Sequence, residues 1–324
     1  MKKLFFLSAL FFQIYFAQIA YSQNTSSWPS RPVKIVVPYG PAGSSDTLAR
    51  IVSEQLSQTF KQSFIIDNKA GAGGTIGSEF VAKSQPDGYT LVISGIGSHV
   101  IAPNLYPNKY DPVKDFTHIA LLGGPPLGLV VNPNLPIQNL KGFINYVKNQ
   151  PDGIVYGSPG IGTHGNIVGE YFAEIAGLKL THIGYKGGSS VVNDIVGGQL
   201  PAGIITVTSA KSLIQANKLR LIAITSAKRL ENFPNVPTFS ELGYPKLTST
   251  TWFSLSGPAG MPETITNKIN AAVNEAMTTP LAKERLTFED MEFQAMGAEA
   301  FNKFIQSEIL TWGGISKKIQ LQNK

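Results

Sequence analysis

The sequence predicts an α/β fold made of two similar units, followed by a helical C-terminal region. Three observations indicate this. From Val33 onward, short β-branched runs alternate with helical patterns; the alternation occurs in two separate series; and the region after position 258 is nearly all helical in pattern. Alternating strands and helices are typical of sheets whose strands are connected by crossover helices.

The first series begins with the apolar run VKIVVP at 33–38, which predicts a strand. A helix is expected next, because Leu48, Val52, Leu56 and Phe60 recur every four residues and form one apolar face. The other elements of this series are a strand at 63–67, a glycine-rich turn at 68–77, a helix to about Lys83 and a strand at 89–94.

The second series begins after GGPP at 123–126. Its predicted elements are a strand at 127–132, a helix at 138–149, a strand at 154–158, a helix at 163–176, a strand at 180–185, a helix at 189–197, a strand at 201–206, a helix at 209–216 and a strand at 219–225. The same order of strand, loop and helix recurs, so two comparable units are expected.

The C-terminal region carries two apolar helical stripes. One consists of Ile265, Ile269, Val273 and Ala276, and the other of Phe301, Ile305, Trp312, Ile315 and Ile319. These helices have few strands of their own to cover, so we expect them to pack on the first unit. The predicted organisation is a discontinuous first lobe, 23–125 and 249–324, and a continuous second lobe, 126–248. Chain crossings are expected near 123–128 and 245–252.

The N-terminus resembles a secretory signal peptide. Lys2 and Lys3 precede an apolar run, and Ala20 and Ser22 provide small residues before a cut at Gln23. The alternative is an uncleaved membrane anchor, which the marginal length of the run and its two glutamines disfavour. We therefore expect residues 1–22 to be removed after Ser22, and the mature protein to be soluble and periplasmic.

The composition excludes several classes of protein. Removing residues 1–22 takes away two lysines and no acids, so the net charge falls from +6 to +4. Lys and Arg are scattered in runs of no more than two, so no nucleic-acid partner is expected. The chain has no cysteine, which excludes disulfides and thiolate metal sites and suits an oxidising compartment.

Two glycine-rich motifs resemble nucleotide-binding loops but depart from their patterns. GIGTHG at 160–165 matches the dinucleotide-binding pattern, but the next predicted strand ends in Tyr185 and Lys186, where a ribose-binding acid would be needed. GAGGTIG at 71–77 has the wrong spacing, and no phosphate-binding P-loop pattern occurs. No cofactor is therefore expected.

The sequence is poor in catalytic motifs. Its four histidines lie outside any H-E-x-x-H pattern, and there is no G-x-S-x-G elbow, so no metal and no enzymatic activity are expected. One enzymatic alternative stays open, a hydrolase using Ser94 or Ser158 with His99 or His164.

Three loops instead share a design suited to anions. Gly43-Ser44-Ser45, Gly73-Gly74-Thr75 and the segment 160–163 each connect the end of a strand to a helix N-terminus through small residues. Such loops expose backbone N–H groups, and the helix dipole adds partial positive charge. The alternative is simple capping, with Ser44 or Ser45 as N-cap and Asp46 in the first turn.

Several stretches, in this order, resemble the solute-binding receptors of tripartite tricarboxylate transporters, the Bug family. They are RPVKIVVPYGPAGSSDTLAR (31–50), NKAGAGGTIGSEFVAKSQPDGYTL (68–91), YDPVKDF (110–116), YGSPGIGT (156–163), GYKGGSSVVNDIVGGQ (184–199), SAKRLENFPNVPTFSELGYP (226–245) and TWFSLSGPAGMP (251–262). The resemblance spans the mature chain. It implies a type II periplasmic binding-protein fold, in which two α/β lobes joined by crossing strands close on a small organic acid. It also implies integral membrane transporter subunits as partners. A monomer is expected, since a receptor must open and dock.

The resemblance also suggests where the ligand binds. Backbone amides of the loop from Tyr39 to Ser45 would hold a carboxylate, and the loop from Ser158 to Thr163 would contribute from the second lobe. The expected ligand-binding residues are Tyr39, Gly43, Ser44, Ser45, Ser94, Ser158, Gly160, Thr163, Asn166 and Tyr185.

The chain departs from the family pattern at three places. Ala42 replaces a frequent Gly, Asn166 stands where a His is frequent, and Leu200-Pro201 replaces a common Val-Asp pair. These changes bear on which carboxylate is bound, which the sequence does not specify. A sensory receptor serving a signalling membrane protein is a further alternative, because it would use the same capture step.

Overall fold

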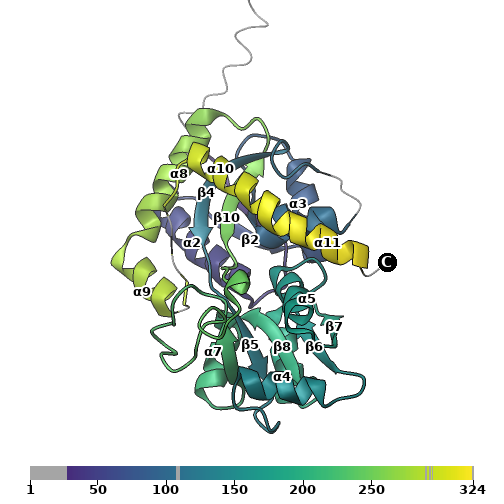
Figure 1. The fold of residues 1–324 in the computed structure, drawn as a ribbon. Helices are drawn as coiled ribbons and strands as arrows, with labels where there is room; N and C mark the ends of the chain where they lie inside the picture. Colours follow the sequence, from purple (N-terminus) through teal and green to yellow (C-terminus); the bar gives the residue numbers. More distant parts are fainter. Residues whose placement is uncertain (1–27, 107–109, 289, 292, 294, 323–324) are drawn as a thin grey trace, which may run out of the picture.

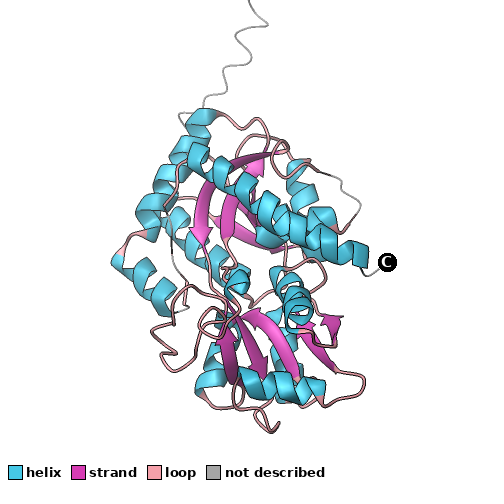
Figure 2. Ribbon diagram, in the orientation of Figure 1, coloured by secondary structure: helices cyan, strands magenta, loops and turns pink. Residues whose placement is uncertain are grey.

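The computed structural model describes residues 28–322 except 107–109, 289, 292 and 294. The predicted signal peptide lies outside the described residues. Two five-stranded sheets, each flanked by helices, form two lobes arranged one above the other (Figures 1 and 2). We call the first sheet and the helices packed on it lobe 1, and the second sheet and its helices lobe 2.

The first sheet has the strand order β2-β1-β3-β10-β4. Its elements are β1 (Val33–Val37), α2 (Ser44–Phe60), β2 (Phe64–Asn68), α3 (Thr75–Ala82), β3 (Thr90–Gly95), β4 (Phe116–Gly123) and β10 (Phe253–Pro258). β1 pairs in parallel with β2 and β3, and the apolar face of α2 packs on this sheet with Leu48, Val52 and Leu56 buried. The predicted order of strand, loop and helix is confirmed here.

The second sheet has the order β7-β6-β8-β5-β9. Its elements are β5 (Leu127–Val131), α4 (Leu140–Lys148), β6 (Ile154–Ser158), α5 (His164–Ala176), β7 (Leu180–Gly184), α6 (Gly188–Val196), β8 (Ala202–Thr206), α7 (Val207–Gln215) and β9 (Arg220–Ile224). β6 pairs in parallel with β7 and β8, while β5 runs antiparallel to β8 and β9. The second sheet is therefore mixed, with both parallel and antiparallel strand pairs.

Two strands of the first sheet lie outside the predicted alternation, β4 and β10. β10 runs antiparallel between β3 and β4, so it returns from lobe 2 into the middle of the first sheet. Its side chains include Ser254 and Ser256, both fully buried, whose hydroxyls lie within hydrogen-bonding distance of the Ser94 hydroxyl. Polar residues in a buried strand weaken the sequence signal, because only the tertiary structure supplies their partners.

The C-terminal helices are α8 (Glu263–Met277), α9 (Pro280–Phe288), α10 (Ala298–Glu308) and α11 (Gly314–Gln322). α8 packs against α2 and β4, and Ile265, Ile269 and Val273 enter the core of lobe 1. α10 and α11 follow one another across lobe 1 in Figure 1; α10 packs on β4, and α11 packs on α5 of lobe 2. The C-terminal helices therefore contact both lobes.

Candidate ligand-binding site

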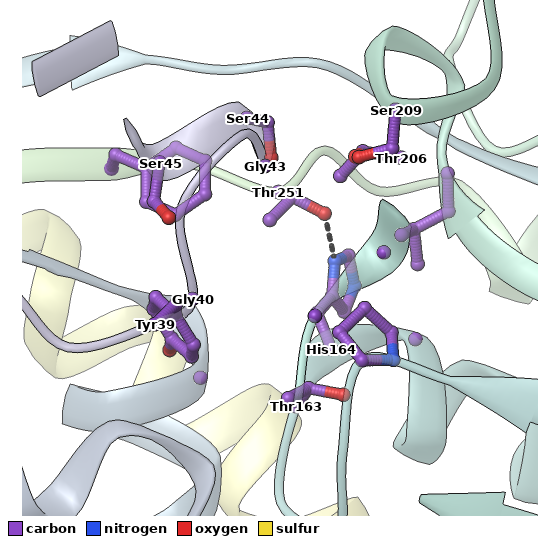
Figure 3. Close-up of a pocket in the computed structure, with 17 residues that line it drawn as sticks. Tyr39, Gly40, Gly43, Ser44, Ser45, Thr163, His164, Thr206, Ser209 and Thr251 are labelled. Carbon is purple, nitrogen blue, oxygen red and sulfur yellow. Dashed lines mark hydrogen bonds between the residues drawn. The ribbon is translucent and has the colours of Figure 1, made fainter. Parts of the chain in front are cut away.

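A cavity lies between the two lobes, at the carboxyl ends of several parallel strands. Its volume is about 60 Å³, which suits a small molecule. The lining residues are Tyr39, Gly40, Gly43, Ser44, Ser45, Gly97, Leu127, Pro159, Thr163, His164, Gly165, Gly187, Gly188, Thr206, Ser209, Thr251 and Phe253. Figure 3 shows Tyr39, Ser44 and Ser45 facing Thr163, Thr206 and Ser209 across this space. Ligands of open α/β sheets characteristically bind beyond the carboxyl ends of strands.

Four helices begin at this cavity. Ser44 starts α2 in lobe 1, while His164, Gly188 and Val207 start α5, α6 and α7 in lobe 2, and the cavity lining includes residues from the first turn of each. The lining contains no Lys, Arg, Asp or Glu among the residues that the structure describes. Among the described lining residues, the groups that can attract an anion are therefore backbone N–H groups and helix N-termini.

Three of these helices begin without a side-chain cap. Gly43 and Gly187, the N-cap residues of α2 and α6, have no side chain to offer, and Thr206 of α7 makes no capping hydrogen bond. Only α5 is capped, by the Thr163 hydroxyl, which accepts from the N–H of Asn166. An oxyanion in the cavity could satisfy the N–H groups that the protein leaves uncapped. The alternative in which Ser44 or Ser45 is the N-cap of α2 is wrong, since Gly43 holds that position.

The first loop is shaped by Asp46, in the first turn of α2. Its carboxylate accepts hydrogen bonds from the backbone N–H of Ala42 (3.2 Å), from Asn68 Nδ2 (3.0 Å) and from Arg50 Nε (2.9 Å). Burial alone would raise the pKa of Asp46, but the hydrogen bonds from Arg50, Asn68 and Ala42 outweigh burial and lower it. Asp46 therefore fixes the loop and does not face the ligand cavity.

Ala42 adopts a left-handed backbone conformation, with φ of 59°. This conformation is unfavourable for a residue with a Cβ, and it is where the sequence departs from the frequent Gly. The turn lets the Ala42 N–H reach Asp46 while its carbonyl accepts from the Ser189 hydroxyl of lobe 2 at 3.4 Å. The strained residue is thus held by both lobes.

Tyr39 forms one wall of the cavity. Its hydroxyl donates to the carbonyl of Gly73 at 3.3 Å, and its ring occupies space that a Cβ at Gly74 or Gly97 would take. Burial raises the pKa of Tyr39 to about 12, so the hydroxyl stays protonated and is a hydrogen-bond donor.

The predicted residues of the second lobe divide into two groups. Thr163 lines the cavity, whereas Ser158, Gly160, Asn166 and Tyr185 lie behind its lining. The Ser158 hydroxyl donates to the carbonyl of Gly160 and lies 2.7 Å from His182 Nε2. Asn166 Oδ1 accepts from the N–H of Gly162. These residues shape the loop and are not part of its ligand-facing surface.

Tyr185 and Ser94 also have partners within the protein. The Tyr185 hydroxyl donates to Asp194 Oδ2 at 2.7 Å, and burial together with the Asp194 carboxylate raises the pKa of Tyr185 to about 12. Ser94 is fully buried between Ser254 and Ser256, at 2.7 and 2.9 Å. The expected contact of Ser94 with the ligand is corrected, because its hydroxyl serves the pairing of β3 with β10.

The structure adds lining residues that sequence reasoning missed: Gly187, Gly188, Thr206, Ser209 and Thr251. It also places in the lining Gly40, which lies within the expected loop from Tyr39 to Ser45, and His164, which was considered only as a hydrolase residue. His164 Nδ1 lies 2.9 Å from the Thr251 hydroxyl, the contact drawn in Figure 3. Burial lowers the pKa of His164 to about 3, so the ring is neutral. The glycines of GYKGGSS at 184–190 were a usable signal, because they precede a helix as the first loop does.

The proposed hydrolase pairs are not assembled. The Ser94 hydroxyl contacts Ser254 and Ser256, and the Ser158 hydroxyl lies 2.7 Å from His182 Nε2. His99 Nδ1 lies 3.1 Å from the Ser98 hydroxyl, and His164 contacts Thr251. Within the described residues, no group of three or more His, Asp or Glu could hold a metal ion.

The rims of the two lobes touch beside the cavity. A Cβ on Gly40 would lie 2.7 Å from the carbonyl oxygen of Lys186, so only a glycine permits this approach of backbone to backbone. On another side, the Tyr106 hydroxyl donates to the carbonyl of Ile161 at 3.2 Å. The lobes are therefore in a closed arrangement.

Two α/β lobes with a cavity at the ends of their strands define the fold of periplasmic solute-binding proteins, and similar solved structures share it. A protein of R. palustris with adipate has a TM-score of 0.87 and 31% identity, covering 90% of this chain and 98% of that one. MatC from Rhodopseudomonas palustris, with bound malate, has a TM-score of 0.84 and 30% identity, covering 89% and 100%. The predicted type II periplasmic binding-protein fold is confirmed.

The family follows from sequence comparison. The model described as the tripartite tricarboxylate transporter family receptor matches residues 48–321, and BugT of Bordetella pertussis is 32% identical over 304 residues, 93% of each chain. The chain belongs to the tripartite tricarboxylate transporter receptor family. The part of the chain that the structure describes contains no helix with the length and hydropathy of a membrane span.

Proposed function

We propose that this protein is a periplasmic receptor that captures a small organic carboxylate between its lobes and delivers it to a tripartite tricarboxylate-type membrane transporter. The observation that carries the proposal is the convergence of four helix N-termini, three of them uncapped, on a cavity with no charged side chain in its described lining. In this account residues 1–22 direct export and are removed, and the mature chain acts as a monomer without turnover of its ligand.

The geometry favours a ligand with two oxyanion groups. One carboxylate would cap α2, with its oxygens near the N–H groups of Ser44 and Ser45, and the other would face α6 and α7, near Gly188 and Ser209. A charge-assisted hydrogen bond contributes about 1.5–3 kcal/mol net. Three or four of them could sustain micromolar affinity, about −8 kcal/mol, after the costs of association. The adipate and malate bound by similar proteins are dicarboxylates and support this choice.

Closure would follow from a ligand that touches both lobes. The lobes we propose to move as units are 23–125 with 249–324, and 126–248, connected through the crossings near 123–128 and 245–252. A carboxylate that caps α2 in lobe 1 and α6 or α7 in lobe 2 is bound fully only when the lobes approach. Such a ligand has a higher affinity for the closed form and shifts the population toward it.

The test is a thermal-shift screen of residues 23–324, refolded from denaturant to remove retained ligand. The panel contains mono-, di- and tricarboxylates, amino acids, sugars and cations. A ligand at a hundredfold excess over its dissociation constant adds about 2.7 kcal/mol of stability, which raises the melting temperature clearly. Shifts confined to carboxylates, strongest for short dicarboxylates, are expected. Shifts confined to sugars, amines or cations would contradict the proposal.

The delivery step separates this proposal from a sensory receptor. Uptake of the identified carboxylate by cells should require both this protein and large hydrophobic transporter subunits. Uptake that is unchanged when the protein is deleted, together with a changed transcriptional response to the carboxylate, would favour sensing.

A further inference from the structure

We propose that Lys211 and Asp290 form a latch that holds the closed lobes together from outside the ligand cavity and thereby sets ligand affinity. The proposal rests on the proposed function in one respect, namely that the lobes close on a ligand. Lys211 lies on α7 of lobe 2, and Asp290 follows α9 of lobe 1. Neither residue lines the cavity.

The two charges are buried against each other. Lys211 Nζ lies 3.0 Å from Asp290 Oδ2, and the residues are only 4% and 8% exposed. The contact is an ion pair without hydrogen-bond geometry, and neither atom has a hydrogen-bonding partner among the described residues. The Phe288 ring covers the ammonium, with its centroid 4.7 Å from Nζ. Each charge therefore depends on the other for compensation.

Asn232 of lobe 2 strengthens the same contact. Its Nδ2 donates to Asp290 Oδ1 at 2.7 Å and lies 3.3 Å from the carbonyl of Thr287. Both oxygens of the Asp290 carboxylate thus face groups of the opposite lobe. If the lobes separated here, the carboxylate would exchange both contacts for water.

Asp290 is held firmly to lobe 1. Its backbone is left-handed, with φ of 54°, a conformation that Asp tolerates better than most residues. The turn is closed by hydrogen bonds from Asp290 N to Thr287 O and from Met291 N to Leu286 O. Leu286 and Met291 are buried in the core of lobe 1. The carboxylate therefore moves with lobe 1.

Lys211 is connected directly to the cavity by α7. The N-terminal end of this helix places Thr206 and Ser209 in the cavity lining, and Lys211 lies in the next turn. A ligand that caps α7 and the ion pair at Lys211 would therefore act on the same rigid element. Within the described part of the chain, a second ion pair between the lobes joins Lys318 to Glu174, whose side chains are 59% and 33% exposed, so water screens it.

The physical basis of the latch is the asymmetry between closed and open forms. Removing one partner of a buried ion pair leaves an uncompensated charge, which is strongly unfavourable in the closed form. In the open form the same charge is hydrated and costs little. Single substitutions should therefore destabilise the closed form selectively, and neutralising both residues should cost less than the two single changes together.

The experiment measures closure and affinity in the same molecules. The chain has no cysteine, so Gln58→Cys on α2 and Lys148→Cys on α4, both exposed, place one spin label on each lobe without competing labelling sites. Lys211→Met, Asp290→Asn and the double variant are introduced in this background. Lys303→Met is the matched control, because it removes an exposed ion pair within α10. Inter-label distances are measured without ligand and with malate or adipate, and dissociation constants by calorimetry.

Each single variant should shift the distance distribution toward longer distances and weaken malate or adipate binding by about tenfold or more, as expected for an uncompensated buried charge. The double variant should recover part of the loss, and Lys303→Met should behave as the wild type. The double variant also tests the latch if a single variant folds poorly, because it leaves neither Lys211 nor Asp290 as an unpaired buried charge. Distances and affinities of all three variants that match those of Lys303→Met would overturn the latch.

The latch and the proposed function can fail separately. Wild-type protein that binds a carboxylate while the variants bind and close equally well refutes only the latch. Unliganded wild-type protein that shows the short distance, lost in Lys211→Met, while no carboxylate binds, supports the latch and refutes the carboxylate function. Wild-type protein that shows only long distances under every condition refutes the latch, since the pair then never forms.

Discussion

One residue in the loop beside the cavity, Ala42, has a strained backbone conformation. Ala42 has a left-handed backbone where Gly would be relaxed, yet its N–H contacts Asp46 and its carbonyl contacts Ser189 of the other lobe. Contacts with two separate elements hold a conformation that the local sequence disfavours. Residues in such conformations persist when the surrounding structure determines them.

Replacing Ala42 with Gly should therefore stabilise the protein. The removed strain, about 1–2 kcal/mol for a left-handed residue, is offset in part by the greater entropy of Gly in the unfolded chain, leaving about 1 kcal/mol or less. Urea unfolding measures the change. Ala271→Gly, in the exposed interior of α8, is the control and should destabilise by about 1 kcal/mol. Destabilisation by both changes would contradict the strain at Ala42.

The buried histidines should make the folded protein less stable as the pH falls. Burial lowers the pKa of His118 to about 4 and that of His164 to about 3, while an unfolded histidine titrates near 6.5. Above about pH 6.5 both states are neutral and stability is unaffected. As pH falls below this value, only the unfolded state binds protons, so stability is lost. Between about pH 7 and pH 5, each such histidine should cost about 2 kcal/mol.

The measurement compares urea unfolding of wild type and His118→Gln at the two pH values. The variant should lose about 2 kcal/mol less than the wild type over this interval. Burial raises the pKa values of Glu170 and Glu308, which acts in the opposite sense but equally in both proteins. Equal losses in the two proteins would show that His118 is not buried in its neutral form.

At the scale of the element, helix N-termini provide the chemistry that side chains do not. α2, α6 and α7 begin without side-chain caps, and all three begin at the cavity. An uncapped helix end costs stability, which Ser, Thr, Asn or Asp at the N-cap would normally restore. A ligand oxyanion can supply the missing acceptor.

Ser209→Asp should imitate the ligand at α7. A carboxylate in the first turn is favourable to the helix by about 0.3–1 kcal/mol, so stability should be unchanged or slightly raised. The same charge would occupy the cavity and repel a second anion, so carboxylate affinity should fall by about tenfold or more. Calorimetry with the best ligand from the thermal-shift screen gives the affinity.

Ser212→Asp is the control, because it adds the same charge at an exposed position of the same helix. Its affinity should stay within about twofold of the wild type, since exposed charges are screened. Equal losses in both variants would mean that the effect is a long-range one and that α7 does not face the ligand.

At the scale of the whole molecule, closure depends on how near the two backbones come. Gly40 of lobe 1 lies against the carbonyl of Lys186 in lobe 2, with no room for a Cβ. The contact lies between lobes, so it matters only when they are closed.

Gly40→Ala should therefore prevent full closure without unfolding either lobe. Carboxylate affinity should fall by about tenfold or more, while the free energy of unfolding without ligand should stay within about 0.5 kcal/mol of the wild type, as for ordinary surface changes. Gly297→Ala is the control, because a Cβ there would meet no atom within 4 Å. Wild-type affinity in Gly40→Ala would show that the lobes do not need to approach this closely.

The sequence by itself determined the order of strands and helices apart from β4 and β10, the two glycine-rich loops that begin α2 and α5, and the family. These features depend on local periodicity, on turn residues and on motifs that are continuous in the chain. Tyr39, Gly43, Ser44, Ser45 and Thr163 could be chosen in this way, because each lies in or beside such a loop.

Only the tertiary structure decided which polar residues face the cavity. The Ser94 hydroxyl contacts Ser254 and Ser256 within the sheet, and these serines lie 160 and 162 positions further along the chain. Thr206, Ser209 and Thr251 are brought to the cavity by strand order and by a chain crossing, and Lys211 meets Asp290 across the two lobes. Such contacts join residues far apart in the chain, and hydrogen-bonding partners of that kind leave no periodic signal in the sequence.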